Sequence, residues 1–293
     1  MSRGPATSVG GIWRDPALWM ALPATLFMLL VFVYPFLDGL RLSFTPAEGG
    51  DALANYKKFF DTPSLYLTIG LTMKLALPAT LINVGIAVPL AYRLRHKTRY
   101  QKIATTIITI PLTLGTVLIA EGMLTYFGPR GWFSQAVQAL HLYDRPVHLT
   151  HNYWGVLISL VISGFPFSFL LILSYVTGID PVLARAAATL GATPARQFRH
   201  IVLPLLAPGL AMTFCLAFVQ AFSVFPSAVL LGAPAGPTRV ISIAAYEAAF
   251  ENYDYSMASS IAMIMGAVQF AVVVLVLALR GLAYRGPATG GKG

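Results

Sequence analysis

The stretch from Asp180 to Pro204 reads DPVLARAAATLGATPARQFRHIVLP and stands between two long apolar segments of the chain. Asp180 followed by Pro181 predicts a helix start, because an Asp side chain accepts bonds from free amides and proline is tolerated at the first helical position. The Ala-rich residues 182–190 favour helix. Gly191 is expected to end that helix, since glycine adopts a positive φ at little cost.

The second half of this stretch repeats the same signals. Thr193 and Pro194 form another cap-plus-proline pair and predict a second helix. That helix is expected to end near Leu203, before Pro204. The sequence therefore predicts a short helix, a glycine corner and a second helix. A loop this ordered, in so apolar a chain, indicates a docking surface for another protein.

The rest of the chain is too apolar for a soluble domain. Of its 293 residues, 57% are hydrophobic and 11% are charged, and the mean hydropathy is +0.71. A soluble domain carries about 25% charged residues. A bilayer-crossing helix needs about 20 mostly apolar residues, and stretches of this kind run from about Ala17 to Leu37, Leu71 to Tyr92, Ile103 to Tyr126, Tyr153 to Thr177, Gly209 to Leu231 and Ser256 to Leu279.

The positions of the basic residues predict the orientation of these spans. The net charge is +9, and cytoplasmic loops of membrane proteins carry an excess of Lys and Arg. With both termini inside, thirteen of the 20 basic residues fall on the cytoplasmic side, namely Arg3, Arg14, Arg93, Arg95, Lys97, Arg99, Lys102, Arg185, Arg196, Arg199, Arg280, Arg285 and Lys292. We therefore expect an all-α integral membrane protein with six transmembrane helices and both termini cytoplasmic. The basic excess is explained by topology and does not indicate a nucleic-acid partner.

The expected organisation is simple. Residues 1–16 form a cytoplasmic tail, residues 17–280 a single transmembrane domain with a cytoplasmic loop at 178–208, and residues 281–293 a flexible tail. Between the third and fourth spans, residues 132–142 carry apolar side chains at helical spacing. We interpret them as a short helix lying on the outer membrane surface, or alternatively as a helix that caps the bundle.

The loop at 178–208 resembles the EAA-loop signature of permease subunits of bacterial ATP-binding-cassette importers. Ala186-Ala187, Gly191 and Ile201-x-Leu203-Pro204 match that signature at every spacing, whereas Arg185 stands where the signature has Glu. Further resemblance lies in Tyr34-Pro35, Leu90-Ala91-Tyr92, Gly164-Phe-Pro-Phe167, Phe225-Pro226 and Leu231-Gly232. These features look most like the branch that carries polyamines, ferric iron, thiamine, opines and aminophosphonates. The sugar-permease branch is the second choice.

The resemblance implies a location in the bacterial inner membrane and a set of partners. These are two cytoplasmic ATPase subunits, a second permease that is homologous or identical, and an extracytoplasmic solute-binding protein. The docking surface for the ATPase would consist of Pro181, Arg185, Ala186, Ala187, Leu190, Gly191, Ile201, Leu203 and Pro204. The chain lacks a G-x-x-x-x-G-K-[ST] phosphate loop, so ATP and Mg²⁺ are expected on the partner ATPase and no cofactor on this chain.

Polar residues inside the spans are candidates for the solute pathway, because burying them in lipid is costly. The candidates are Glu121, Asn83, Ser168, Gln220, Ser223, Ser227 and Gln269. The alternative for the uncharged residues is hydrogen bonding between helices. Glu121 could instead reach water or pair with a base, and Lys74 is expected to extend outward from its helix or to pair with Glu121. Prolines within the spans predict kinks, which would suit helices that change shape or merely pack.

The outer loop before the last span is acidic and aromatic. Glu247, Glu251 and Asp254 lie among tyrosines there, so this loop is a candidate docking surface for a solute-binding protein or a region that attracts a cationic solute. The alternative is an ordinary solvated loop. A polyamine-like cation is the favoured solute.

Two other classes of protein are weaker alternatives. A stand-alone secondary transporter would need no ordered cytoplasmic loop. A membrane-embedded enzyme would need catalytic residues, and the sequence has neither an H-E-x-x-H pair nor a G-x-S-x-G turn. His148 and His151 have a spacing that could share a metal, yet no third ligand accompanies them, and the lone Cys215 excludes an intrachain disulfide. We therefore expect no metal site and no enzymatic activity.

Overall fold

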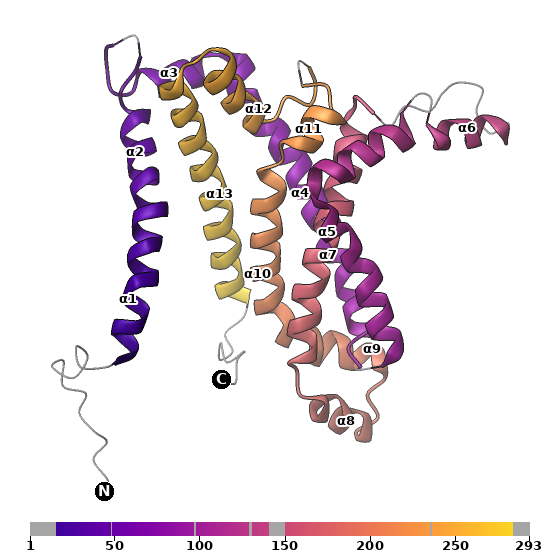
Figure 1. The fold of residues 1–293 in the computed structure, drawn as a ribbon. Helices are drawn as coiled ribbons and strands as arrows, with labels where there is room; N and C mark the ends of the chain where they lie inside the picture. The colour runs from indigo at the N-terminus through magenta and orange to yellow at the C-terminus, as the bar shows by residue number, and fades with distance from the viewer. Residues whose placement is uncertain are drawn as a thin grey trace, which may run out of the picture.

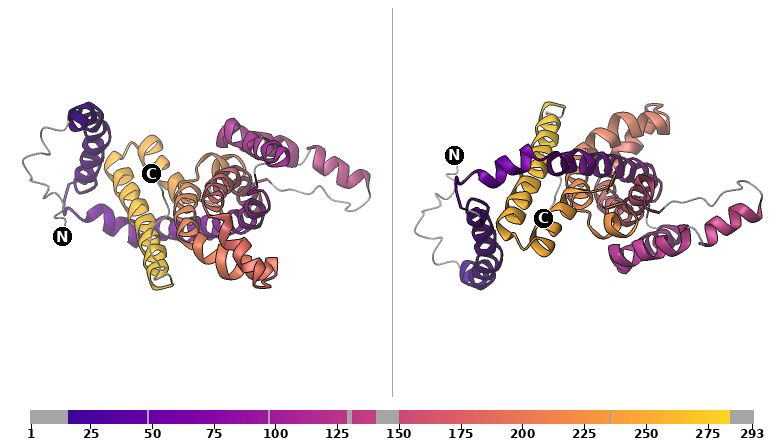
Figure 2. Two further views of the ribbon diagram at one scale, coloured as in Figure 1. Left: turned by 90° about the horizontal axis from the view of Figure 1, so that it is seen from below. Right: turned by 90° about the horizontal axis from the view of Figure 1, so that it is seen from above.

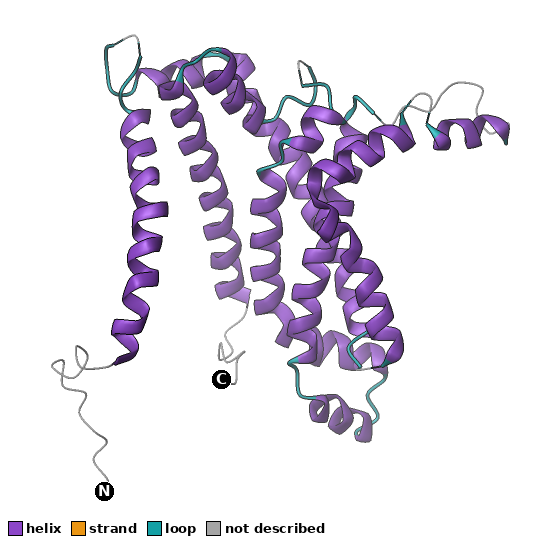
Figure 3. Ribbon diagram, viewed as in Figure 1, coloured by secondary structure: helices purple, strands orange, loops and turns teal. Residues whose placement is uncertain are grey.

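The computed structural model describes residues 16–283, apart from residues 48, 97, 129–130, 141–149 and 235. Within these residues the chain is helical and contains no strand (Figure 3). Six helical segments are long and apolar enough to cross a membrane, at Leu22–Ser43, Pro63–Arg93, Arg99–Ala136, Tyr153–Thr177, Pro194–Phe222 and Tyr255–Gly281. The predicted all-α fold with six spans is confirmed.

The helices follow the chain in the order labelled in Figure 1. They are α1 (Pro16–Met28), the π-turn η2 (Leu29–Val33), α2 (Tyr34–Ser43), α3 (Ala54–Asp61), α4 (Pro63–Arg93), α5 (Arg99–Phe127), α6 (Trp132–Ala139), α7 (Tyr153–Thr177), α8 (Pro181–Thr189), α9 (Pro194–Gln197), the π-turn η3 (Phe198–Val202), α10 (Leu203–Phe222), α11 (Pro226–Leu230), α12 (Ile241–Tyr246), the π-turn η4 (Glu247–Glu251) and α13 (Tyr255–Ala283).

The centre of the bundle is formed by α4, α7 and α10. In α7, 56% of the most apolar 18-residue stretch is buried, whereas none of the corresponding stretch of the first span is buried (0%). The first span packs on α13 through α2, and α5 packs on α7. Seen along the bundle, the first span and α5 with α6 lie at opposite edges (Figure 2). These two edge segments therefore present wide apolar surfaces that no part of the described chain covers.

The two ends of the bundle differ. One end, here called the α8 end, carries α8, the start of α1 and the end of α13 (Figure 1). The other end, here called the α3 end, carries α3, α6, α11 and α12. The first and last spans thus begin and finish at the same end, as an even number of crossings requires. The orientation predicted from the distribution of basic residues would place the α8 end in the cytoplasm.

The helix α6 lies across the direction of the bundle at the α3 end (Figure 1). Trp132 at its start is 76% exposed, and α6 extends away from the edge of the bundle rather than over it. This placement agrees with a helix on the membrane surface and not with a cap on the bundle. The helix ends at Ala139, and residues 141–142 of the predicted segment lie outside the described residues.

Prolines shape two of the spans through π-turns. A proline has no amide proton, and its ring clashes with the carbonyl four residues earlier. Just before Pro35 and before Pro204, the backbone amide bonds five residues back instead, from Tyr34 to Leu29 and from Leu203 to Phe198. The wider turn gives the proline ring room. The helix therefore continues through Pro204, so the prediction that it ends near Leu203 is wrong.

The fifth span also ends earlier than predicted. The helix α10 finishes at Phe222 rather than at Leu231, and α11 follows after a short break. The residues from 223 to 231 are apolar because α11 packs on α5 and α7, and Ala228 and Leu231 are fully buried. Composition alone does not separate such a buried short helix from the end of a span.

A tyrosine compensates for a proline in α4. Pro78 cannot donate to the carbonyl of Lys74, and this carbonyl accepts a 2.8 Å hydrogen bond from the hydroxyl of Tyr153 at the start of α7. We expect Tyr153→Phe to destabilise the protein by about 1–3 kcal/mol, because the carbonyl is left without a donor. Thermal unfolding in detergent would measure this, with Tyr100→Phe, an 80% exposed tyrosine, as the matched control. Equal melting temperatures for the two variants would contradict the assignment.

Candidate functional site

The hairpin of α8 and α9, residues 180–197, is here called the cytoplasmic hairpin after its predicted location, and it begins as the sequence predicts. The Asp180 carboxylate accepts a 2.9 Å hydrogen bond from the amide of Val182, and Pro181 occupies the first turn of α8. At the second helix the Thr193 hydroxyl accepts a 3.4 Å bond from the amide of Arg196. Both predicted helix starts are confirmed.

The corner between the two helices is a Schellman motif. The amide of Gly191 bonds to the carbonyl of Ala188 and that of Ala192 to the carbonyl of Ala187, each at 3.0 Å. This pair of bonds requires a left-handed residue between them, and Gly191 has φ +81°. The side chain of Gln197 donates a 2.8 Å bond to the carbonyl of Ala192, which fixes α9 against the corner. The geometry of the hairpin is thus set by backbone bonds that only a few residue types permit.

Most of the surface of α8 is left exposed by the described chain. None of its residues is buried, and Leu190, directly after it, is 89% exposed. Val182 and Leu183 are 53% and 46% exposed. Arg185 and Ala186 are exposed as well. Helix α8 is short, exposes valine and leucine side chains, and projects from the end of the bundle (Figure 1). These are features of a docking element.

The remaining residues of the predicted docking set lie at the base of the hairpin. Ile201 in η3 and Leu203 at the start of α10 are half-buried, and Pro204 is exposed. Ile201 and Leu183 line a small cavity of about 110 Å³ between α8 and the ends of α4 and α7. These residues connect the hairpin to the spans and do not extend the exposed face of α8.

An aromatic contact that the sequence did not predict lies at this base. The Tyr92 ring at the end of α4 lies 4.7 Å, centroid to centroid, from the Phe198 ring in η3. The guanidinium of Arg95 lies 3.8 Å from the centroid of the Tyr92 ring and donates a 3.0 Å bond to the Tyr92 carbonyl. The spacing of Tyr92 and Arg95 by three residues was the available signal. Movement of the hairpin would therefore reach α4 as well as α10.

Three of the predicted pathway residues are buried between helices. Asn83 in α4 is 2% exposed and donates a 3.4 Å bond to the carbonyl of Leu160 in α7. Ser168 is fully buried. The hydroxyl of Ser227 in α11 hydrogen-bonds that of Ser159 in α7 at 2.8 Å. Asn83 and Ser227 thus make hydrogen bonds between helices, which is the alternative that the sequence left open, whereas the buried Ser168 hydroxyl has no hydrogen-bond partner within the described residues.

The other predicted pathway residues are more accessible. Glu121 in α5 and Gln220 in α10 are exposed. Ser223 lies just beyond α10, where its hydroxyl accepts a 2.9 Å bond from Gln269 of α13. Lys74 is exposed on α4, and within the described residues no ion pair joins it to Glu121. Glu121 is therefore exposed and without an ion pair among the described residues.

The acidic residues at the α3 end have different roles. Glu247 pairs with Arg239, whose Nε lies 3.1 Å from the carboxylate, and Asp254 caps α13 through a 2.9 Å bond from the amide of Met257. Glu251 is exposed. Only Glu251 of the three has no ion pair, cap or side-chain bond among the described contacts. In the outer segment between the first and second spans, a hydrogen bond from Lys57 lowers the pKa of Asp51.

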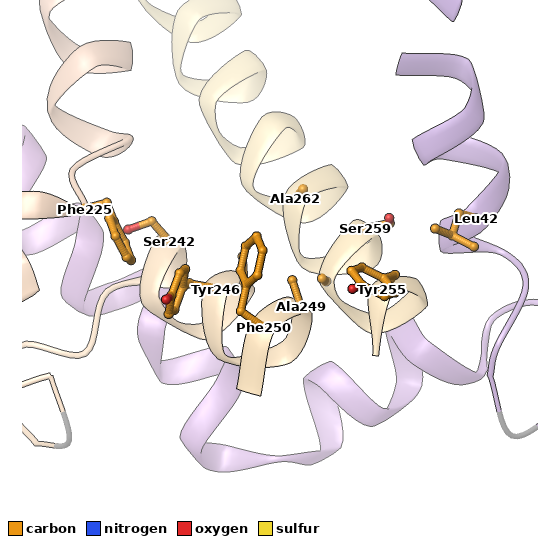
Figure 4. A pocket seen from close by; sticks show the side chains of 11 residues that line it. Leu42, Phe225, Ser242, Tyr246, Ala249, Phe250, Tyr255, Ser259 and Ala262 are labelled. Atoms are coloured by element: carbon orange, nitrogen blue, oxygen red, sulfur yellow. The ribbon is translucent and has the colours of Figure 1, made fainter. Parts of the chain in front are cut away.

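Beside these residues is an uncharged cavity of about 510 Å³ (Figure 4). The rings of Phe225, Tyr246 and Phe250 form a row along it, with neighbouring centroids 5.1 and 5.0 Å apart. Small side chains such as Ala249, Ser259 and Ala262 lie alongside, and Tyr255 faces the row from α13 (Figure 4). The cavity offers aromatic faces and hydroxyl groups.

The described residues contain no group of three or more potential metal ligands. His148, one of the two histidines considered for a metal, lies outside the described residues. His151 makes a 3.3 Å contact with the carbonyl of Gly232.

Comparison with known proteins places this geometry in a family. Residues 83–284 match the model of the binding-protein-dependent transport system inner membrane component. The probable sulfate transport system permease protein cysT of Prototheca wickerhamii is 26% identical over 218 residues, covering 74% of this chain and 82% of the relative. The spermidine/putrescine transport system permease protein PotB of Haemophilus influenzae is 26% identical over 218 residues, covering 71% and 76%.

Two further similarities extend over more of the chain. The probable starch degradation products transport system permease protein AmyD of Thermoanaerobacterium thermosulfurigenes is 25% identical over 266 residues, covering 87% of this chain and 89% of the relative. A chain of the bacterial alginate ABC transporter, solved in complex with an alginate pentasaccharide-bound periplasmic protein, has the same fold, with a TM-score of 0.77, 23% identity and coverage of 91% and 94%. The chain belongs to the family of inner-membrane permease components of binding-protein-dependent ABC transport systems, in which ATP hydrolysis resides on a separate subunit.

Proposed function

We propose that this permease subunit uses the cytoplasmic hairpin to receive the force of two ATPase subunits. The supporting observation is α8, a capped helix without a buried residue, held at a fixed angle by the Gly191 corner. Closure of the ATPases around ATP would pull α8. Because α9, η3 and α10 form one continuous helix, that pull would pass directly into the fifth span. The bundle would then alternate between outward and inward access.

A second permease, homologous or identical, would complete the membrane domain. The first span is long and apolar, and none of its most apolar 18-residue stretch is buried (0%). Within the described chain it is tied at its outer end, where the Ser260 hydroxyl donates a 2.9 Å bond to the Ser43 carbonyl and the Ser256 hydroxyl donates a 3.2 Å bond to the Leu42 carbonyl. A second permease or lipid would cover the remainder.

The solute we favour is a polyamine-like cation. One relative is a spermidine/putrescine permease, and at the α3 end an exposed carboxylate, Glu251, stands near the row of aromatic rings, whose faces attract cations. A sugar-type solute is the second candidate, since another relative is a permease for starch degradation products and aromatic rings also suit sugars. Glu121, Asn83, Ser168, Gln220, Ser223 and Ser227 remain candidates for the pathway.

The decisive experiment is reconstitution in liposomes. The chain, its second permease, the ATPase and the binding protein together should take up the solute only with ATP. Uptake by the permeases alone, without ATPase, would instead indicate a secondary transporter. Comparing a labelled polyamine with a labelled maltodextrin in the same liposomes would decide between the two solute classes.

We propose that Glu251, together with Asp254 and Glu247, forms part of the surface that contacts the binding protein. Reversing a charge at the rim of an interface weakens binding through electrostatic mismatch. We expect Glu251→Lys to raise the binding-protein concentration needed for half-maximal ATPase stimulation by about tenfold. Asp61→Lys, an exposed acid at the same end on α3, is the matched control. An unchanged concentration dependence in Glu251→Lys would remove this residue from the docking surface.

A further inference from the structure

The helix α5 is broken half-way along its length. Gly115 has φ +70° and ψ 167° inside an otherwise helical segment, and Figure 1 shows α5 changing direction as it rises toward α6. Gly115 lies midway between Ile103 and Tyr126, the ends of the predicted third span. At 1.5 Å per residue it is about 18 Å along a hydrocarbon core about 30 Å thick. The break is therefore near the middle of the membrane.

The break leaves backbone groups without helical partners. Pro111 cannot donate to the carbonyl of Ile107, one turn below, and the conformation of Gly115 turns the next peptide group out of the helical ladder. The hydroxyl of Thr113 also donates a 2.7 Å bond to the carbonyl of Ile110 in this segment. Unpaired backbone at this depth costs several kcal/mol in lipid, and it is tolerated only inside protein or beside water.

Nothing in the described chain covers the break. Every residue from 112 to 118 is exposed, and a Cβ atom on Gly115 would meet no atom within 4 Å. Lipid is excluded as the neighbour, because it cannot form hydrogen bonds with the unpaired backbone groups. The remaining neighbours are another protein surface or water.

The charge of Glu121 distinguishes between a protein surface and water as the neighbour of this segment. In the upper half of α5, Ile119, Ala120 and Met123 are buried, so the exposed side is the one that carries Val117 and Glu121, four residues apart. An unpaired carboxylate pressed into an apolar protein contact carries a desolvation penalty of several kcal/mol. Beside water it stays hydrated. Within the described residues no ion pair involves Glu121.

We infer that the exposed broken segment of α5, with the polar residues Thr113, Thr116 and Glu121 around Gly115, lines a water-filled section of the solute pathway. This inference rests on the proposed function and adds a place and a chemistry to it. Discontinuous membrane helices present free backbone groups to solutes. Here they are combined with two hydroxyl groups and one carboxylate, a set suited to a cationic solute or to one rich in hydroxyl groups.

Cysteine accessibility in the assembled transporter tests the inference. In a Cys215→Ala background, Thr113→Cys and Thr116→Cys are exposed to a charged, membrane-impermeant methanethiosulfonate. The matched control is Phe270→Cys, which is 71% exposed at the middle of the unbroken helix α13. We expect the two threonine positions to react at least about tenfold faster than position 270, since thiolates form in water and not in lipid. Should Cys215→Ala fail to assemble, the native protein, with its buried Cys215, serves as the baseline.

The sign of the reagent makes the test specific for Glu121. A cationic reagent should react with Thr116→Cys faster than its anionic analogue, and Glu121→Gln should remove that difference. Reaction at the rate of position 270 would overturn the inference. So would oxidative cross-linking of Thr116→Cys to the second permease without reaction in water. Solute-stimulated ATPase activity, measured on the same samples, separates the outcomes, because its loss alone would count against the proposed function.

Discussion

Replacing Gly191 with Val should abolish coupling between ATP hydrolysis and transport while leaving the protein inserted in the membrane. Gly191 has φ +81°, and side chains with a Cβ, above all β-branched ones, are strained there by about 1–2 kcal/mol or more. No atom lies within 4 Å of the position of a Cβ, so the substitution acts through the backbone and not through a clash. Straightening the corner would swing α8 away from its direction relative to α9.

Two further variants isolate that cause. Gly191→Asn should retain most of the coupling, because Asn tolerates the left-handed conformation better than other residues. Gly178→Ala, at a glycine of the same loop with φ −77°, should behave like the native protein. The measurement is solute-stimulated ATPase activity and uptake in proteoliposomes, normalised to permease content. If Val and Asn at position 191 gave the same activity, the direction of α8 would not depend on this corner.

The hairpin was predictable because its signals are local. The Asp180 and Thr193 caps, the prolines that follow them and the Gly191 corner each act within one turn of the backbone. The number of spans was likewise predictable, since length and apolar composition determine what crosses a bilayer. These features need no knowledge of the rest of the fold.

The features that the sequence did not reveal depend on contacts between distant segments or on the shape of a turn. Pro204 was interpreted as a stop, but a π-turn carries the helix through it. The hydroxyls of Ser159 and Ser227 meet although 68 residues separate them, and no local pattern indicates that pair. Gly115 stands in an ordinary apolar run, and its conformation alone shows that α5 is broken.

Replacing Leu190 with Asp should prevent stable assembly with the ATPase. Leu190 is 89% exposed, so the change costs the isolated permease almost nothing in stability. Burying a leucine contributes about 1.5–3 kcal/mol, and an unpaired carboxylate in the same contact opposes binding further. We expect the ATPase to dissociate at least about 100-fold more readily, which is about 2.7 kcal/mol.

The readout of this prediction is recovery of the ATPase with the tagged permease from detergent, followed over a dilution series. Leu190→Met, which keeps the apolar surface, should retain the ATPase. Tyr253→Asp places the same charge on a residue that is 74% exposed at the α3 end, and there it should leave ATPase recovery unchanged. Because Leu190 is exposed directly after α8, a loss confined to Leu190→Asp would locate the contact at the end of this helix. Full recovery with Leu190→Asp would mean that the ATPase is held elsewhere on the cytoplasmic face, with the basic residues between α4 and α5 as the next surface to substitute.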